Sequence, residues 1–215
     1  MFDLDGVLVD TMHVIRAAWA GWATDRGLSA DEVLASIHMT ATELIDRFAP
    51  SADPATEIRA IAARQSMLDP KVVAFPGAAQ LIEVLPERAW AIVTSARREV
   101  AVRHLEMAAL PVPAVLISAE DTPRGKPDPA GYRIAADRLR VAPERCLAIE
   151  DSPAGLSAAL AAGMFAIGVT NTHSGRELAH ASAVVASLTT IEVTHDLHRI
   201  RLRWTDWIED FRDPD

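Results

Sequence analysis

Two pairs of acidic residues stand where their side chains could share one crevice. Asp3 and Asp5 are one residue apart, and Gly6 permits the turn that would aim both at the same place. Glu150 and Asp151 follow a second apolar run. Several carboxylates in one crevice repel one another, and a hard divalent cation, above all Mg²⁺, relieves that repulsion. Helix capping alone would explain the EDSPAG pair, but four acids at two predicted strand ends favour a metal site.

Hydroxyls, a helix start and a lysine could hold an anion that the acids alone would repel. Thr94 and Ser95 precede a helix expected to begin near Arg97, where free backbone N–H groups can bind phosphate. Only two of the 21 basic residues, Lys71 and Lys126, are lysines. Lys126 lies in RGKPDP, from which a compact ammonium can reach a phosphoryl oxygen or a carboxylate. Alternatively, these residues are a strand-end cap and a solvated loop lysine.

The pattern of apolar residues changes near residue 76, and this change indicates which elements position the candidate residues. Residues 13–69 have the spacing of several helices and contain no convincing strand. Beyond residue 76, β-rich runs alternate with helical segments. These segments are expected to begin near Gly77, Arg97, Pro129, Pro153 and Gly175. Such alternation predicts parallel strands with helices on both faces, and the short segment MFDL would join that sheet.

The predicted fold class is α/β: a doubly wound, Rossmann-like parallel-sheet core with an inserted all-helical cap. Residues 1–12 and 76–194 would form the core, residues 13–75 the cap, and residues 195–215 a C-terminal tail. In such sheets the chemistry lies beyond the carboxyl ends of the strands. Besides the residues above, the positions that follow predicted strands hold Glu120, Asp121, Asn171 and His173.

Charge and composition limit the classes of partner. The net charge is −9 and no basic cluster is present, which argues against nucleic acid and membrane as partners. The single cysteine, Cys146, permits no internal disulfide and suits a reducing cytoplasm. No signal peptide is visible, and the longest apolar stretch is too short for a bilayer. We expect a cytoplasmic protein that acts on a small phosphorylated metabolite as a monomer or weak homodimer.

Four motifs stand in order along the chain: DLDGVLVDT, IVTSA, RGKPDP and IEDSPAG. With them the chain resembles the haloacid-dehalogenase-like hydrolase superfamily over nearly its whole length. Three segments are similar in sequence to bacterial phosphatases of small sugar and polyol phosphates: IVTSA, EDSPAGLSAALAAGM and the cap stretch SIHMTATELIDRFAP. β-Phosphoglucomutase shares the core motifs and remains an alternative. A weakly active binding protein on the same fold is a further alternative.

The resemblance implies hydrolysis of a phosphate monoester through an aspartyl-phosphate. Asp3 would be the nucleophile, and Asp5 would protonate the leaving alcohol and then deprotonate the attacking water. Thr94 and Lys126 would hold the transferring phosphoryl group. Mg²⁺ would be the cofactor, held by the side chains of Asp3, Asp151 and Glu150 and by the backbone carbonyl of Asp5.

Other parts of the chain carry weaker expectations. His13 and His38 belong to the predicted cap or its hinge and could face the substrate. The first strand is shorter than in the resembled family, which suggests a coding start upstream of Met1. In the tail, the alternation in HRIRLRW predicts an exposed edge strand without chemistry.

Overall fold

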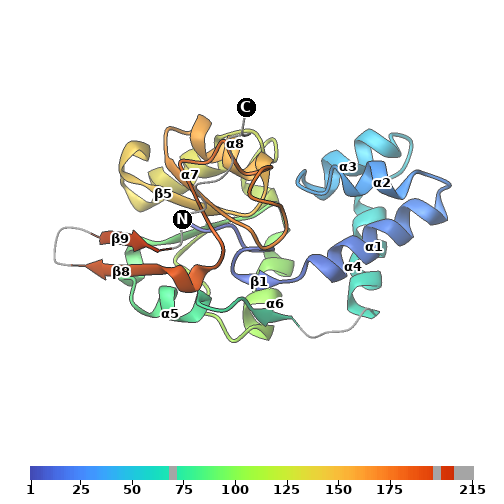
Figure 1. Ribbon diagram of the computed structural model, residues 1–215. Helices are drawn as coiled ribbons and strands as arrows, with labels where there is room; N and C mark the ends of the chain where they lie inside the picture. Colours follow the sequence, from blue (N-terminus) through green and yellow to red (C-terminus); the bar gives the residue numbers. More distant parts are fainter. Residues whose placement is uncertain (68–71, 196–199, 206–215) are drawn as a thin grey trace, which may run out of the picture.

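The computed structural model describes residues 1–67, 72–195 and 200–205. Figure 1 shows two parts: an α/β part that contains the amino terminus, and a helical part at one side formed by residues 12–67. Lys71 and the last ten residues of the predicted tail lie outside the described residues. Within the described ranges, no helix is long and apolar enough to cross a bilayer.

The α/β part is built on a parallel sheet. Its strands are β3 (Ala91–Val93), β4 (Val115–Ile117), β5 (Leu147–Glu150), β6 (Phe165–Val169) and β7 (Ala183–Val185). Strand β3 pairs with β4, and β6 pairs with both β5 and β7, all in parallel. Phe2 forms parallel bridges to Ile92 of β3 and Ile149 of β5, which join these two groups. The short N-terminal segment therefore joins the sheet, as expected, and the structure places it between β3 and β5.

Helices cover both faces of this sheet because successive strand residues point to opposite sides. Ile92 and Ile149 face a hydrophobic cluster that includes residues of α5 (Ala78–Glu83) and α6 (Arg98–Met107). Ala91 and Ala148 face a second cluster with α7 (Ala130–Leu139) and α8 (Pro153–Ala161). The doubly wound α/β arrangement predicted from the sequence is confirmed.

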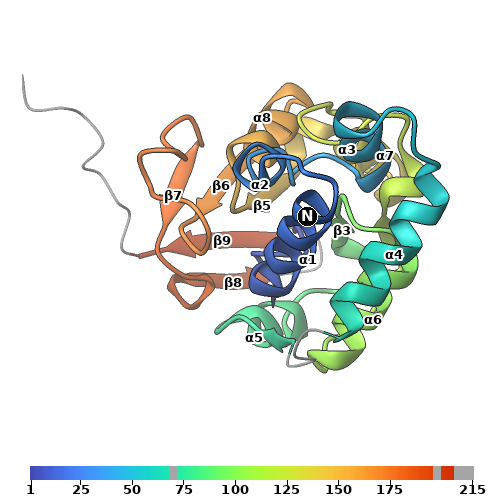
Figure 2. The same ribbon diagram turned by 90° about the vertical axis from the view of Figure 1, so that its right-hand side faces the viewer.

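The helical part has a hydrophobic core of its own. Its helices are α1 (Met12–Asp25), α2 (Ala30–Leu34), α3 (Ala41–Phe48) and α4 (Pro54–Met67). The buried members of their cluster all come from residues 18–61, with Trp19 and Trp22 edge to face at a centroid distance of 5.3 Å. An antiparallel pair, β1 (Val9–Asp10) and β2 (Val73–Ala74), flanks this part in sequence. Figure 2 shows the four helices in front of the sheet.

The C-terminal region differs in detail from the sequence-based expectation. Strands β8 (Ile191–His195) and β9 (Ile200–Trp204) pair antiparallel, so the strand expected in HRIRLRW is present and the expected boundary after residue 194 falls inside β8. The helix predicted near Gly175 is wrong, because residues 175–180 form turns. Ser182 already donates its N–H to Ala166 of β6 at 2.8 Å, which leaves too few residues for a stable helix.

Candidate active site

A cleft of about 900 Å³ is lined by residues of both parts of the protein. Polar residues line its floor on the sheet side, among them Asp3, Asp5, Thr94, Lys126 and Asp151. The helical part contributes a mainly apolar wall that includes Ile15, Trp19, Leu34, Ile58 and Ile61. The cleft therefore combines a charged floor with an apolar roof.

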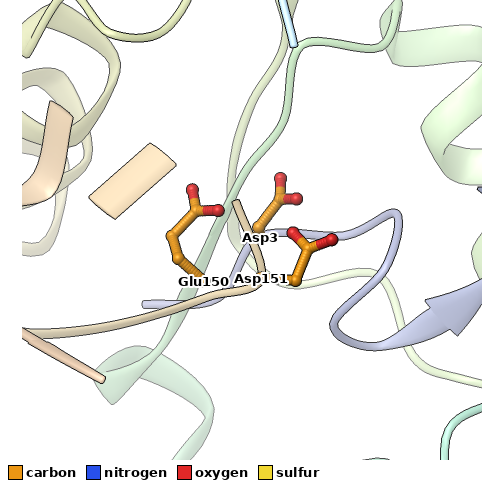
Figure 3. A group of neighbouring side chains, drawn as sticks. All are labelled: Asp3, Glu150 and Asp151. Carbon is orange, nitrogen blue, oxygen red and sulfur yellow. The ribbon is translucent and has the colours of Figure 1, made fainter. Parts of the chain in front are cut away.

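Three buried acids meet at the floor of the cleft. Asp3, Glu150 and Asp151 each offer a carboxylate oxygen, and these oxygens lie within 4.8 Å of one another (Figure 3). Asp3 directly follows Phe2, which bridges β3 on one side and β5 on the other. The Asp3 N–H donates to the carbonyl of Ile149 at 3.0 Å, directly before Glu150. Because parallel strands end at the same edge, their carboxyl ends bring these acids together.

Lys126 supplies the positive charge inside this cluster. Its Nζ lies 2.7 Å from Asp3 Oδ1 and 2.6 Å from Glu150 Oε1, and the residue is 8% exposed. Burial would lower the pKa of Lys126, but the charges of Asp3 and Glu150 outweigh it and raise that pKa above its ordinary value. The Tyr132 hydroxyl also donates to Glu150 Oε1, at 2.5 Å. Lys126 is therefore a charged ammonium at the nucleophile predicted from the sequence.

The acidic cluster fits a hard divalent cation. In the described part of the chain, Oε2 of Glu150 is a buried oxygen without a hydrogen-bond partner. Burial raises the pKa of Asp3 well above its ordinary value, although Lys126 opposes that rise. Three carboxylates around one ammonium leave negative charge uncompensated, and an oxygen-liganded cation would neutralise it.

The metal-free protein is expected to lose stability as the pH rises from about 4 to about 7. Burial, and then the charge of Glu150, raises the pKa of Asp151 to about 7, whereas an unfolded aspartate titrates near about 4. Between these values the folded chain holds a proton that the unfolded chain has lost, so unfolding becomes easier with rising pH. Added Mg²⁺ should raise the thermal midpoint most at the higher pH, where the carboxylates are ionised.

Thermal unfolding in EDTA and in excess Mg²⁺, at both ends of this pH range, checks the expectation. Asp151→Asn removes the titrating group, so both the pH slope and the response to Mg²⁺ should shrink. Asp137→Asn changes an exposed aspartate on α7 and should keep both. A metal-free midpoint that rises with pH across this range would contradict the predicted linkage.

Gly6 allows the loop after Asp5 to pass against this cluster. Its φ is +92°, and a Cβ at this position would lie 2.2 Å from Oδ2 of Asp151. The Asn171 side chain holds the same turn by donating to the carbonyl of Gly6 at 2.9 Å. Asn171, predicted to follow a strand end, therefore shapes the loop that carries Asp5.

Asp5 has two hydrogen-bonding contacts of its own. Thr11 donates its hydroxyl to Asp5 Oδ1 at 2.5 Å, and Nδ1 of His104 lies 2.9 Å from the same oxygen. Thr11 precedes the first residue of α1, and His104 lies on the buried face of α6. Sequence analysis did not single out His104. The available signal was its helical spacing from Ala101 and Leu105, which places all three residues on the buried face of the helix.

The remaining phosphate-binding candidates have different surroundings. Thr94 is buried at the cleft, and its Oγ1 accepts from the N–H of Ala96 at 3.0 Å. Ser95 donates its hydroxyl to the backbone carbonyl of His38 at 2.9 Å, which links β3 to the helical part. His38 lines the cleft. Burial, with the charge of Arg47, lowers the pKa of His38.

A second link between the two parts involves the loop of Lys126. Gly125 donates its N–H to Glu43 Oε1 at 3.0 Å. Glu43 also completes the N-terminal cap of α3, where its carboxylate accepts from the backbone and the hydroxyl of Thr40. The helical part therefore contacts the residue next to Lys126, a contact that sequence analysis did not anticipate.

Three predicted positions lie away from the acidic cluster. His13 is exposed and is not among the described residues that line the cleft. Glu120 and Asp121 instead pair with arginines, Arg97 at 3.0 Å and Arg138 at 2.8 Å respectively. A position after a strand end therefore did not suffice to predict a place in the acidic cluster, because Glu120 and Asp121 follow β4 but pair with arginines instead.

Comparison with known proteins places the chain in a family. Residues 1–163 match the haloacid dehalogenase-like hydrolase family, and the chain belongs to it. The resemblance expected from the four motifs is thereby confirmed.

Several individual proteins within reach of this family comparison are similar to the chain over most of its length. Hexitol phosphatase A of Escherichia coli (strain K12) is 38% identical over 200 residues, which cover 90% of this chain and 93% of that protein. Validoxylamine A 7'-phosphate phosphatase of Streptomyces hygroscopicus subsp. limoneus is 36% identical, with 91% and 96% covered. The crystal structure of β-phosphoglucomutase from Clostridium difficile matches with a TM-score of 0.74 and 25% identity, covering 89% of this chain and 91% of that chain.

Proposed function

We propose that this protein is a Mg²⁺-dependent phosphatase that hydrolyses small phosphorylated sugars or polyols through an aspartyl-phosphate on Asp3. The observation that carries the proposal is the buried contact of Lys126 with Asp3, beside Glu150 and Asp151, at the floor of a substrate-sized cleft. Membership of the hydrolase family and the relatives named hexitol phosphatase A and validoxylamine A 7'-phosphate phosphatase support it.

The chain's own residues can carry out both halves of the reaction. A carboxylate oxygen of Asp3 would bond to phosphorus while the bond from phosphorus to the substrate oxygen breaks. Asp5 would give its proton to that departing oxygen, and would then take a proton from the water that attacks the aspartyl-phosphate. This second step would release inorganic phosphate and restore Asp3. Lys126 and Thr94 would hold the phosphoryl oxygens.

A divalent cation would bind among the acids that surround Asp3. Asp3, Glu150 and Asp151 would hold it through their side chains, and Asp5 through its backbone carbonyl, as the family resemblance implies. When bound, Mg²⁺ neutralises charge that would otherwise keep a carboxylate away from a phosphate dianion. We also propose that residues 13–75 act as a cap over the substrate, and that the protein works in the cytoplasm as a monomer or weak homodimer.

A phosphosugar mutase is the second candidate, because the chain also matches the β-phosphoglucomutase structure. A mutase must hold a sugar bisphosphate in two orientations and keep water from the aspartyl-phosphate. The helical wall of the cleft is mainly apolar, for example at Ile15, Leu34 and Ile58. Its polar side chains are those of Arg16, Asp31, His38 and Gln65. We therefore favour hydrolysis.

Product analysis is expected to show inorganic phosphate as the main product. The enzyme would be incubated with β-glucose 1-phosphate, Mg²⁺ and a trace of the 1,6-bisphosphate, and both products would be followed. A parallel assay with a hexitol phosphate should release phosphate stoichiometrically. Glucose 6-phosphate that accumulates much faster than phosphate would assign the protein to the mutases. Failure to hydrolyse even p-nitrophenyl phosphate in Mg²⁺ would favour a binding protein.

A further inference from the structure

His104 is a buried histidine at the edge of the active-site cleft that the proposed mechanism does not use. It is 8% exposed, and its Nδ1 lies 2.9 Å from Asp5 Oδ1. We infer that His104 is a positioning residue that holds the Asp5 carboxyl group in the orientation needed for proton transfer. The inference rests on the proposed function, because Asp5 is there the group that exchanges protons with the leaving alcohol and with water.

The geometry around Asp5 supports this role. Thr11 and His104 approach the same oxygen, Oδ1, from two different elements. Two contacts on one oxygen restrict rotation of the carboxyl group and leave Oδ2 to exchange the proton. Thr11 is the N-cap residue of α1 and so lies at the start of the helical part. His104 instead belongs to the core, where neighbouring Ala101 and Leu105 pack into the hydrophobic cluster of the sheet.

The consequence for catalysis depends on the leaving group. With an alcohol as leaving group, Asp5 must deliver a proton to the ester oxygen as its bond to phosphorus breaks. A nitrophenolate leaves readily as an anion, so its first step needs no such proton. In the role inferred here, His104 acts only through Asp5 and exchanges no proton with the substrate. Its loss should therefore weaken only steps in which the orientation of Asp5 matters.

The test compares kcat/KM for a hexitol phosphate and for p-nitrophenyl phosphate in excess Mg²⁺. This constant reports steps up to release of the alcohol or phenol, so it isolates the first proton transfer. His104→Leu keeps much of the side-chain volume and removes both ring nitrogens. We expect a loss of about 10- to 100-fold for the hexitol phosphate, up to the cost of misplacing a catalytic group by about 1 Å, and little change for the aryl ester.

A conservative variant separates positioning from packing. An asparagine amide nitrogen can occupy the place of Nδ1, so His104→Asn should recover most of the hexitol-phosphate activity. His104→Gln extends its amide beyond that place and should recover less. If His104→Leu does not fold, as judged by circular dichroism, the comparison of Asn with Gln carries the test. His180→Asn changes an exposed histidine and should leave both substrates unaffected.

Two failures can be told apart by including Asp5→Asn. This variant should lose about 10²-fold or more with the hexitol phosphate and much less with the aryl ester. If it shows no such selectivity, the role proposed for Asp5 is wrong and the inference about His104 fails with it. If Asp5→Asn is selective but the His104 variants change both substrates equally, or neither, only the inference about His104 is overturned.

Discussion

Asp3→Asn is expected to lower phosphatase turnover by about 10⁴-fold or more, because an amide cannot replace the carboxylate as nucleophile. The substitution is nearly isosteric, and its amide can still lie against Lys126. Asp5→Asn should also be strongly impaired, by about 10²- to 10⁴-fold, but for a different reason, since it loses a proton donor and acceptor. Steady-state release of phosphate from a hexitol phosphate measures both effects.

The covalent intermediate distinguishes the two variants. Acid quenching during turnover, followed by intact-protein mass spectrometry, should reveal a phosphorylated form in Asp5→Asn with p-nitrophenyl phosphate. Asp3→Asn should show none. Asp46→Asn, which changes an exposed residue of α3, serves as the matched control and should behave as the wild type. Near wild-type turnover in Asp3→Asn would rule out the aspartyl-phosphate mechanism.

Lys126→Ala is expected to reduce kcat/KM by about 10²-fold or more, because it removes the cation that would hold the phosphoryl group. It also leaves Asp3 and Glu150 buried beside Asp151 without their ion-pair partner. Breaking a buried ion pair in this way typically costs about 3–5 kcal/mol of stability. Excess Mg²⁺ should restore part of that stability but little of the activity, since it cannot replace the ammonium at its own position.

Thermal unfolding and kinetics on the same samples separate these two effects of Lys126→Ala. Arg138→Ala is the matched control, because it removes a basic side chain that is 44% exposed and pairs with Asp121 outside the cleft. That variant should change both quantities little, since Asp121 keeps its ion pair with Arg98 at 2.8 Å. Equal kinetic losses in the two variants would show that Lys126 has no special role at the phosphoryl group.

The sequence alone determined the class of fold and most of the acidic site. The alternation of apolar runs with helical spacing arises from local side-chain patterns, so it predicted β3 to β7 and the helices α6, α7 and α8. The resemblance of the four motifs to the hydrolase family made Asp3, Lys126 and Asp151 candidate site residues, and the structure brings these side chains together. Periodicity was insufficient at Gly175, where a short segment with polar and apolar residues at helical spacing forms turns instead.

Only the tertiary structure decided which of these side chains meet. Residues 1–3 lie between β3 and β5, and this sheet order places Asp3 beside Glu150, far away in sequence. The packing of α6 brings His104 to Asp5, while Glu120 and Asp121 pair with arginines away from the acidic cluster. Strand order and helix packing depend on burying apolar surface across the whole domain. Local patterns therefore indicate which residues are candidates for chemistry, and long-range packing decides which of these candidates lie together.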